Sequence, residues 1–226
     1  MTRSLKQLLL AVASMPLLAI ATLRATPVDL QEVGLGAHEE GVQYYSDPTP
    51  FPDNNPFNTA TVKAGVIDLL VNGVATEAFC IEPFQASLSG TSGYDFATLA
   101  SAPDPLGPMG DTAAKKIEQL WAKYYSPSIS NADAAALQIA IWETVDAAVS
   151  GGTFTLLSND YGASVMLAWV NDAANANAAT ADLTALVNSQ GQDYVVQNVP
   201  DGGTSVALLG LSFVGLIALR RKFRAA

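Results

Sequence analysis

Residues 61–81 read TVKAGVIDLLVNGVATEAFCI, and this stretch predicts the centre of the fold. Two runs rich in β-branched and apolar residues, 61–71 and 74–81, flank the dipeptide Asn72-Gly73. Asn and Gly accept the positive φ angles of a two-residue hairpin turn, so the pattern predicts a β-hairpin. The only cysteine of the chain, Cys80, lies near the end of the second predicted strand.

The segments on either side of the hairpin are rich in proline. Residues 26–58 include the run DPTPFPDNNPFN at 47–58, and residues 90–110 contain three further prolines. Proline excludes helix and interrupts sheet. We therefore expect a loop-rich segment over 26–58, with one strand near Val42 to Tyr45, and a second loop over 90–110.

The rest of the chain has helical signals. Asp111 or Thr112 can cap a helix that runs to about residue 125, and Ser130 or Asn131 can cap another over about 132–149. A third helix is expected over about 161–174, and a closing strand over about 192–199. Strands followed by helices and a strand predict one α+β domain over 26–197. It would have a β-rich part, as a hairpin, sandwich or barrel, and about three helices.

Charge is distributed unevenly along the 226 residues. The chain has 21 acidic and 11 basic residues, and the only basic residues between positions 25 and 219 are four lysines, against all 21 acids, a net charge of −17. Such a surface repels phosphate backbones, which argues against nucleic-acid binding. One cysteine also excludes a disulfide framework within the chain, and one histidine, His38, leaves no Cys and His set for zinc. No cofactor is expected.

Residues 1–25 have the three parts of a secretory signal peptide. Arg3 and Lys6 precede an apolar stretch over 8–21, and Ala19-Ile20-Ala21 provides a cleavage site of the A-x-A type. The apolar stretch is shorter than the roughly 20 residues of a standard membrane span. The sequence therefore predicts export.

The last 29 residues, 198–226, form a second targeting segment. A turn over 200–203 precedes an apolar run over 206–219 and a basic end over 220–224. Positive charge after an apolar run stays on the cytoplasmic side and would hold the tail in the membrane. The tail resembles sorting signals of the PEP-CTERM class, in the VPDSG-like variant, on the residues Val199, Pro200, Asp201, Gly202 and Gly203. This resemblance implies removal by an exosortase, an integral-membrane protease, near 199–204, and delivery to the outer surface or extracellular matrix.

Two short motifs suggest the chemistry of the domain. The first is Phe79-Cys80-Ile81 at a strand end, and the second is LQIAIW over 137–142, which puts the amide of Gln138 beside Trp142 on one helix face. Together they resemble the thioester domains of bacterial surface adhesins. The resemblance implies that Cys80 and Gln138 are thioester partners, with Phe79, Ile81, Ala140 and Trp142 as motif neighbours.

A Cys–Gln thioester would be a stored electrophile. Attack of the Cys80 thiolate on the Gln138 carboxamide expels ammonia, and proximity supplies most of the assistance that this step needs. A surface nucleophile, an amine or a hydroxyl, could then attack the carbonyl and remain covalently bonded. This would be a single binding reaction rather than enzymatic turnover.

Two alternatives to the thioester remain open at the level of sequence. Free cysteine is among the most buried residue types, and glutamine is a good helix former, so Cys80 and Gln138 can both be ordinary core residues. The protein would then be a passive component of a polysaccharide or biofilm matrix. An exported hydrolase that uses paired carboxylates would leave little trace in the sequence.

Overall fold

The computed structural model describes residues 28–46, 58–82, 92–104, 106–149 and 154–198, together with Gln85 and Ser87. The predicted signal peptide (1–25), the sorting motif Val199 to Gly203, the apolar run 206–219 and the basic end 220–224 lie outside these residues. Among the helices that the structure describes, none is long and apolar enough to cross a membrane.

The β-rich part is a closed antiparallel barrel. Its strands are β1 (Val28–Ser46), β2 (Asn58–Val71), β3 (Val74–Cys80), β4 (Ser92–Ala97), β6 (Leu183–Val187) and β7 (Tyr194–Gln197). The sheet order β2-β3-β7-β6-β4-β1 is closed by a further pairing of β1 with β2. Closure leaves none of these six strands as a free edge. A short strand, β5 (Thr155–Leu156), pairs with the end of β1.

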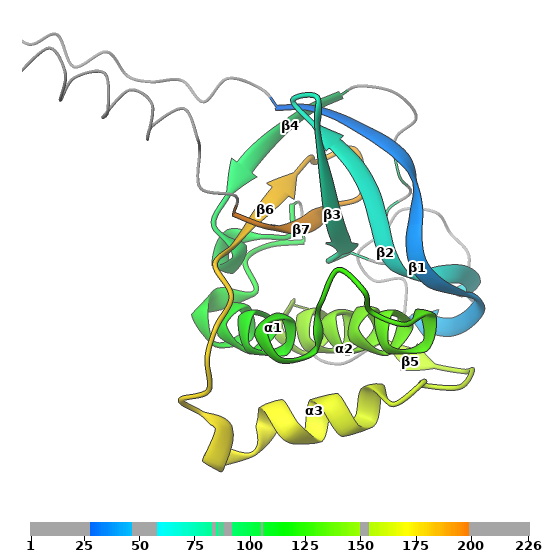
Figure 1. Ribbon diagram of the computed structural model, residues 1–226, viewed down its shortest axis with the longest axis vertical. Coiled ribbons are helices and arrows are strands. Elements are labelled where there is room, and N and C mark those ends of the chain that lie inside the picture. The colour runs from blue at the N-terminus through cyan, green and yellow to red at the C-terminus, as the bar shows by residue number, and fades with distance from the viewer. Residues whose placement is uncertain are drawn as a thin grey trace, which may run out of the picture.

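The predicted hairpin is confirmed. Strands β2 and β3 pair from Val71↔Val74 to Ile67↔Ala78. At the turn, Asn72 has φ 51° and Gly73 has φ 80°, the two positive angles that the dipeptide was expected to adopt. The hairpin brings Cys80 to the end of β3 that faces the helices (Figure 1).

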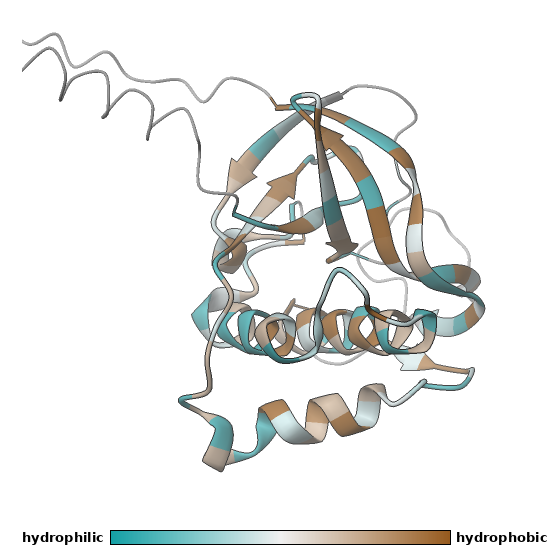
Figure 2. Cartoon of the chain, in the orientation of Figure 1, coloured by the Kyte–Doolittle hydropathy of each residue, from teal (hydrophilic) through white to brown (hydrophobic). Residues whose placement is uncertain are grey.

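The helical part lies against one end of the barrel (Figure 1). Helices α1 (Gly110–Tyr124) and α2 (Asn131–Val149) lie between the strands and α3 (Ala163–Asn171). Helix α2 contacts β1, β2 and β3 as well as α1 and α3, and every residue from 134 to 142 is buried. A helix that is buried on all sides is apolar all round, which explains its Ala- and Ile-rich sequence. Hydrophobic and hydrophilic segments instead alternate along the strands (Figure 2).

Three helices and an α+β arrangement agree with the sequence-based expectation, and so does one predicted cap. Ser130 Oγ accepts a hydrogen bond from the backbone N–H of Asp133 (3.1 Å) at the start of α2. Helix α1 differs, because it begins at Gly110 after Met109 and has no side-chain cap. Helix α3 ends at Asn171, because Asp172 caps a separate 3₁₀ turn, η2 (Ala173–Asn175), by accepting from the Ala174 N–H (2.9 Å).

The expected loops over 26–58 and 90–110 are wrong in part. Residues 28–46 form one long strand, because the prolines of that segment lie outside it, at 27 and from 48 onward. Its glycines and bulges allow a strongly bent strand that alternation of residue types does not reveal. Residues 92–97 form β4, and Leu99–Ser101 form a 3₁₀ turn, η1, before the prolines of the second loop begin. Strands β5 and β6 were also not predicted.

Strands β1 and β2 lie close together at Gly65, which faces His38. Gly65 has φ +148°, and a Cβ atom there would clash with the carbonyl oxygen of Ala37 and lie 2.6 Å from His38 Cα. Only glycine can occupy this position without moving one of the two strands.

We expect Gly65→Ala to lower the free energy of unfolding by at least about 2 kcal/mol, from backbone strain and overpacking. Gly34→Ala is the matched control on β1, because a Cβ atom there would meet nothing within 4 Å. The control should change stability by no more than about 0.5 kcal/mol. Urea unfolding measures both variants, and equal stabilities would contradict the assignment of Gly65 to a close strand contact.

Candidate functional site: the Cys80–Gln138 junction

Cys80 is the last residue of β3 and is only 1% exposed. Its partner on β7 is Tyr194. Where the strand ends, the chain folds around the thiol: Sγ donates to the carbonyl oxygen of Glu82 (3.1 Å) and accepts from the Glu82 backbone N–H (3.3 Å). The sulfur is therefore enclosed by the turn that follows its own strand.

Gln138 on α2 pairs with the backbone of Cys80. The Cys80 N–H donates to Gln138 Oε1 (3.0 Å), and Gln138 Nε2 donates to the Cys80 carbonyl oxygen (2.7 Å). Gln138 is 1% exposed. The pattern LQIAIW thus places a fully buried amide against the cysteine of the companion motif, 58 residues earlier in the chain.

Strand geometry explains why the backbone N–H and C=O of Cys80 are free to pair with Gln138. The β2–β3 ladder ends at Ala78, and the Ile81 N–H donates to the carbonyl oxygen of Asp193, directly before β7 (3.0 Å). Backbone groups of successive strand residues point to opposite sides, so those of Cys80 point to the side that β2 has left. The Gln138 carboxamide satisfies both groups in place of a strand partner. Without it, a buried N–H and a buried C=O would lack partners.

The four predicted motif neighbours pack around this junction. Phe79 meets the ring of Trp121 on α1 edge-on, with centroids 5.3 Å apart. Trp142 lies beside Tyr44 of β1 (6.0 Å between centroids) and Phe154 (6.1 Å). Ile81 and Ala140 have no exposed surface. The structure therefore brings the two predicted thioester partners and their four motif neighbours into one buried region, while their role in thioester chemistry stays a prediction.

A second glutamine contacts the sulfur, and sequence reasoning missed it. Gln192 Nε2 donates to Cys80 Sγ at 2.6 Å. Gln192 is half-buried and lies two residues before β7, in a segment whose only sequence signal is the start of the closing strand. Nothing in the residue pattern separates it from the exposed glutamine at 190.

Burial raises the pKa of the Cys80 thiol to about 12. Three groups oppose this effect and lower the pKa: the indole of Trp142, the backbone of Glu82 and the amide of Gln192. The Trp142 indole N–H is buried and has no hydrogen-bond partner by distance and angle among the described residues. At neutral pH the free thiol is protonated.

Two buried carboxyl groups lie near the cysteine. Burial, with the negative charges of Asp193 and Asp104, raises the pKa of Glu82 to about 9. Burial also raises the pKa of Asp193 to about 7, although Asp193 accepts backbone hydrogen bonds from Asp104 (2.6 Å) and Asn188 (2.7 Å). Neither carboxylate oxygen of Glu82 has a hydrogen-bond partner among the described residues. An uncharged Glu82 is therefore the form compatible with its surroundings at neutral pH.

The described residues contain no group of three or more His, Cys, Asp or Glu side chains placed to hold a metal ion. His38 contacts the carbonyl oxygen of Gly36 through Nδ1 (2.8 Å) and lies 3.8 Å from a carboxylate oxygen of Glu40.

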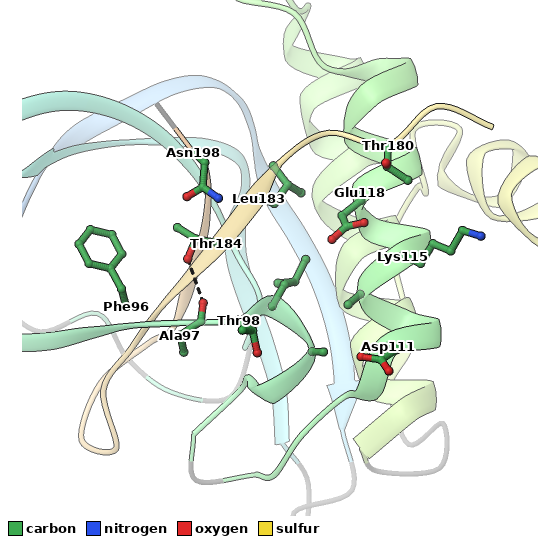
Figure 3. A pocket seen from close by; sticks show the side chains of 13 residues that line it. Phe96, Ala97, Thr98, Asp111, Lys115, Glu118, Thr180, Leu183, Thr184 and Asn198 are labelled. Carbon is green, nitrogen blue, oxygen red and sulfur yellow. Dashed lines mark hydrogen bonds between the residues drawn. The ribbon is translucent and has the colours of Figure 1, made fainter. Parts of the chain in front are cut away.

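A surface groove of about 810 Å³ lies apart from the cysteine, between β4, β6, η1 and α1 (Figure 3). Its charged side chains are Asp111, Lys115 and Glu118, all from α1, and Thr184 donates to the Ala97 carbonyl oxygen (2.9 Å) on its floor. Neither Cys80 nor Gln138 lines it. The groove and the Cys80–Gln138 junction are separate features.

The C-terminal end of the chain matches a known protein-family model. Residues 198–223 match the family model described as the VPDSG-CTERM motif. This segment is a sorting motif. It confirms the resemblance of the tail to VPDSG-type signals, and it implies an exosortase-type system and an exported surface protein. Among curated proteins, no sequence matches the chain.

Two solved structures are similar to the chain. One is the N-terminal thioester domain of a surface protein from Clostridium perfringens, at 10% identity and a TM-score of 0.39, covering 70% of this chain and 98% of that one. The other is a pilus-presented adhesin, at 12% identity and a TM-score of 0.37, covering 77% and 93%.

The raised carboxyl pKa values predict how stability depends on pH. Folded Glu82 and Asp193 keep a proton that the unfolded chain loses above about pH 4. Their contribution is complete below that pH and is lost as pH rises through about 7 for Asp193 and about 9 for Glu82. In a Cys80→Ala background, which removes thiol chemistry, stability should fall with rising pH by up to about 1.4 kcal/mol per pH unit per group.

Urea unfolding at a series of pH values measures this slope. Glu82→Gln should flatten it up to about pH 9, whereas Asp95→Asn, which changes an exposed carboxyl on β4, should leave it unchanged. An unchanged slope in Glu82→Gln would show that Glu82 is ionised in the folded protein.

Proposed function

We propose that Cys80 and Gln138 form an internal thioester, through which this exported surface protein attaches covalently to a partner. The observation that supports the proposal most strongly is the paired hydrogen bonding of the Gln138 carboxamide to the backbone of Cys80. These hydrogen bonds hold the carboxamide against the backbone of Cys80, the residue that carries the only thiol in the chain.

The same two hydrogen bonds suit the bond-forming step. The Cys80 N–H already donates to Oε1, the atom that gains negative charge when the sulfur attacks the carbonyl carbon. The Cys80 carbonyl accepts from Nε2, the atom that leaves, and so fixes the orientation of the leaving amine. The S–Cδ bond forms, the Cδ–Nε2 bond breaks, and the thiol proton departs with ammonia. Each group is held in place before the reaction, which is the condition for high effective molarity.

Burial would preserve the product. Cys80, Gln138 and Trp142 are each no more than 3% exposed, so water has little access to a thioester carbonyl between them. A target nucleophile, such as a lysine amine, would attack Cδ, release Cys80 as a thiol after proton transfer, and stay attached to residue 138 through an amide. The protein reacts once and does not turn over.

The sorting motif supports the cellular setting of this reaction. Exosortase-type processing near 199–204 would release the domain from a transient inner-membrane attachment and deliver it to the cell envelope, outer surface or extracellular matrix. The partner is a surface nucleophile, and the acidic middle of the chain disfavours nucleic acid.

A passive structural role is the main competing hypothesis. Gln138 satisfies two buried backbone groups, and this alone is sufficient reason for a glutamine at that position. In that case the thiol would be free and the protein would act as a matrix component. The two hypotheses differ in one covalent bond, so mass spectrometry separates them.

The intact mass of the folded, secreted domain tests the proposal. We expect the wild-type mass to be lower than calculated by one ammonia, and Cys80→Ala to have its full mass. Methylamine should raise the wild-type mass by one methylamine, to one methylene above the calculated value, and free one thiol, because a small amine opens only a thioester. A full wild-type mass, with one thiol that titrates once the protein is unfolded, would exclude the covalent mechanism.

Peptide mapping of the methylamine adduct identifies the acyl partner. We expect the adduct on Gln138, whose carbonyl oxygen receives the Cys80 N–H, and none on Gln192. Gln138→Ala should abolish the mass deficit, and Gln190→Ala, which changes an exposed glutamine, is the matched control. An adduct on Gln192 would reassign the acyl partner.

A further inference from the structure

The Cys80 sulfur accepts hydrogen bonds from two separate segments of the chain. Gln192, before β7, donates its side-chain N–H (2.6 Å), and Glu82, after β3, donates its backbone N–H (3.3 Å). The Trp142 indole on α2 also lowers the pKa of Cys80, and its buried N–H has no hydrogen-bond partner by distance and angle among the described residues. Apolar burial of a cysteine would require none of these groups.

Positive N–H dipoles around a sulfur favour its charged form. Both steps of the proposed reaction pass through a sulfur with negative charge: attack on Gln138 begins from the thiolate, and capture of a target amine expels it. Hydrogen bonds to the charged form stabilise it more than the neutral form. The donors thus oppose the burial that keeps the resting thiol protonated.

Gln192 is the better placed of the two donors. Its contact with the sulfur is the shorter one, and its half-buried side chain lies at the margin of the buried region. Its backbone is fixed, because the Gln192 carbonyl accepts from Tyr94 Oη (3.0 Å) and the next carbonyl accepts from Ile81 (3.0 Å). The side-chain amide is therefore presented to the sulfur from a rigid segment, and little reorganisation is needed when charge develops.

We propose that Gln192 is a functional residue of the thioester chemistry, whose side-chain N–H stabilises the Cys80 sulfur as a thiolate when it attacks Gln138 and when it is expelled. This inference rests on the proposed function. During capture the amine attacks Gln138 Cδ, the Cδ–S bond breaks, and the thiolate takes the proton that the attacking amine loses. Gln192 gains and loses no bond; it donates a hydrogen bond to the sulfur throughout.

The test compares Gln192→Leu and Gln192→Glu with wild type and with Gln190→Leu, a control in the same loop. Intact mass follows the rate at which methylamine opens the thioester. A hydrogen bond to a charged group predicts reaction about 10- to 100-fold slower in both Gln192 variants and an unchanged rate in the control. Trp142→Phe, which keeps an aromatic ring but removes the indole N–H, should slow the reaction in the same direction.

The direction of the effect separates this role from a structural one. A variant that only loosened the site would react faster, because amine and water would reach the buried carbonyl more easily. Rates equal to or faster than wild type in both Gln192 variants, with circular dichroism unchanged, would overturn the proposal. A methylamine adduct on Gln192 itself would also overturn it.

A second measurement does not depend on the thioester. Protein with a free Cys80 thiol, either untreated or opened with methylamine, is alkylated with iodoacetamide at a fixed mildly alkaline pH, where the rate follows the thiolate fraction. We expect about tenfold slower alkylation in Gln192→Glu, which keeps the size of the side chain. If wild type shows no mass deficit, the proposed function fails while this comparison still tests whether Gln192 stabilises the thiolate. Alkylation of Gln192→Glu at the wild-type rate would contradict that role.

Discussion

The carboxamide of Gln138 makes both of its hydrogen bonds to the backbone of one residue, Cys80, and the barrel and the helices meet at this contact. It allows β3 to extend beyond its pairing with β2 without leaving buried polar groups unsatisfied. It also fixes the depth and rotation of α2, which contacts three strands and both other helices. Any side chain at 138 without both a donor and an acceptor would leave one end of this contact unmade.

Two opposing environments meet at the thiol. Apolar burial and the carboxyl of Glu82 raise the pKa of Cys80, whereas N–H groups from three segments lower it. A neutral thiol that is protected at rest and stabilised when charged suits a group that must react at one moment and stay inert otherwise. The protonated state expected for Glu82 also favours a charged sulfur, because a second negative charge beside it would disfavour the thiolate.

The parts of this fold that the sequence predicts are those with strong local signals. Asn72-Gly73 specifies its turn, Ser130 caps α2, and the two short motifs predict that Cys80 and Gln138 belong together. Only the part of β1 near Val42 to Tyr45 was expected, because bulges interrupt the alternation along the rest of the strand. Strand β4 was missed because it is short and precedes a proline-rich loop. Gln192 could not be assigned, because its importance arises from the pairing of β7 with β3, which brings the segment before β7 beside the sulfur. Glu82 could not be assigned, because its contact with the sulfur depends on the turn after β3.

The place of Gln138 in the chain also determines where mechanical force would travel. A protein captured at residue 138 and retained at its C-terminal end carries tension only through residues between those points, which include α3, β6 and β7. The hairpin, β1, β4 and α1 precede Gln138 and lie outside that path. Since β7 pairs with β3 at Cys80, pulling on the tail would first load the strand beside the sulfur. The region that unfolds under load would then be the C-terminal third of the domain, while the covalent attachment at residue 138 stays intact.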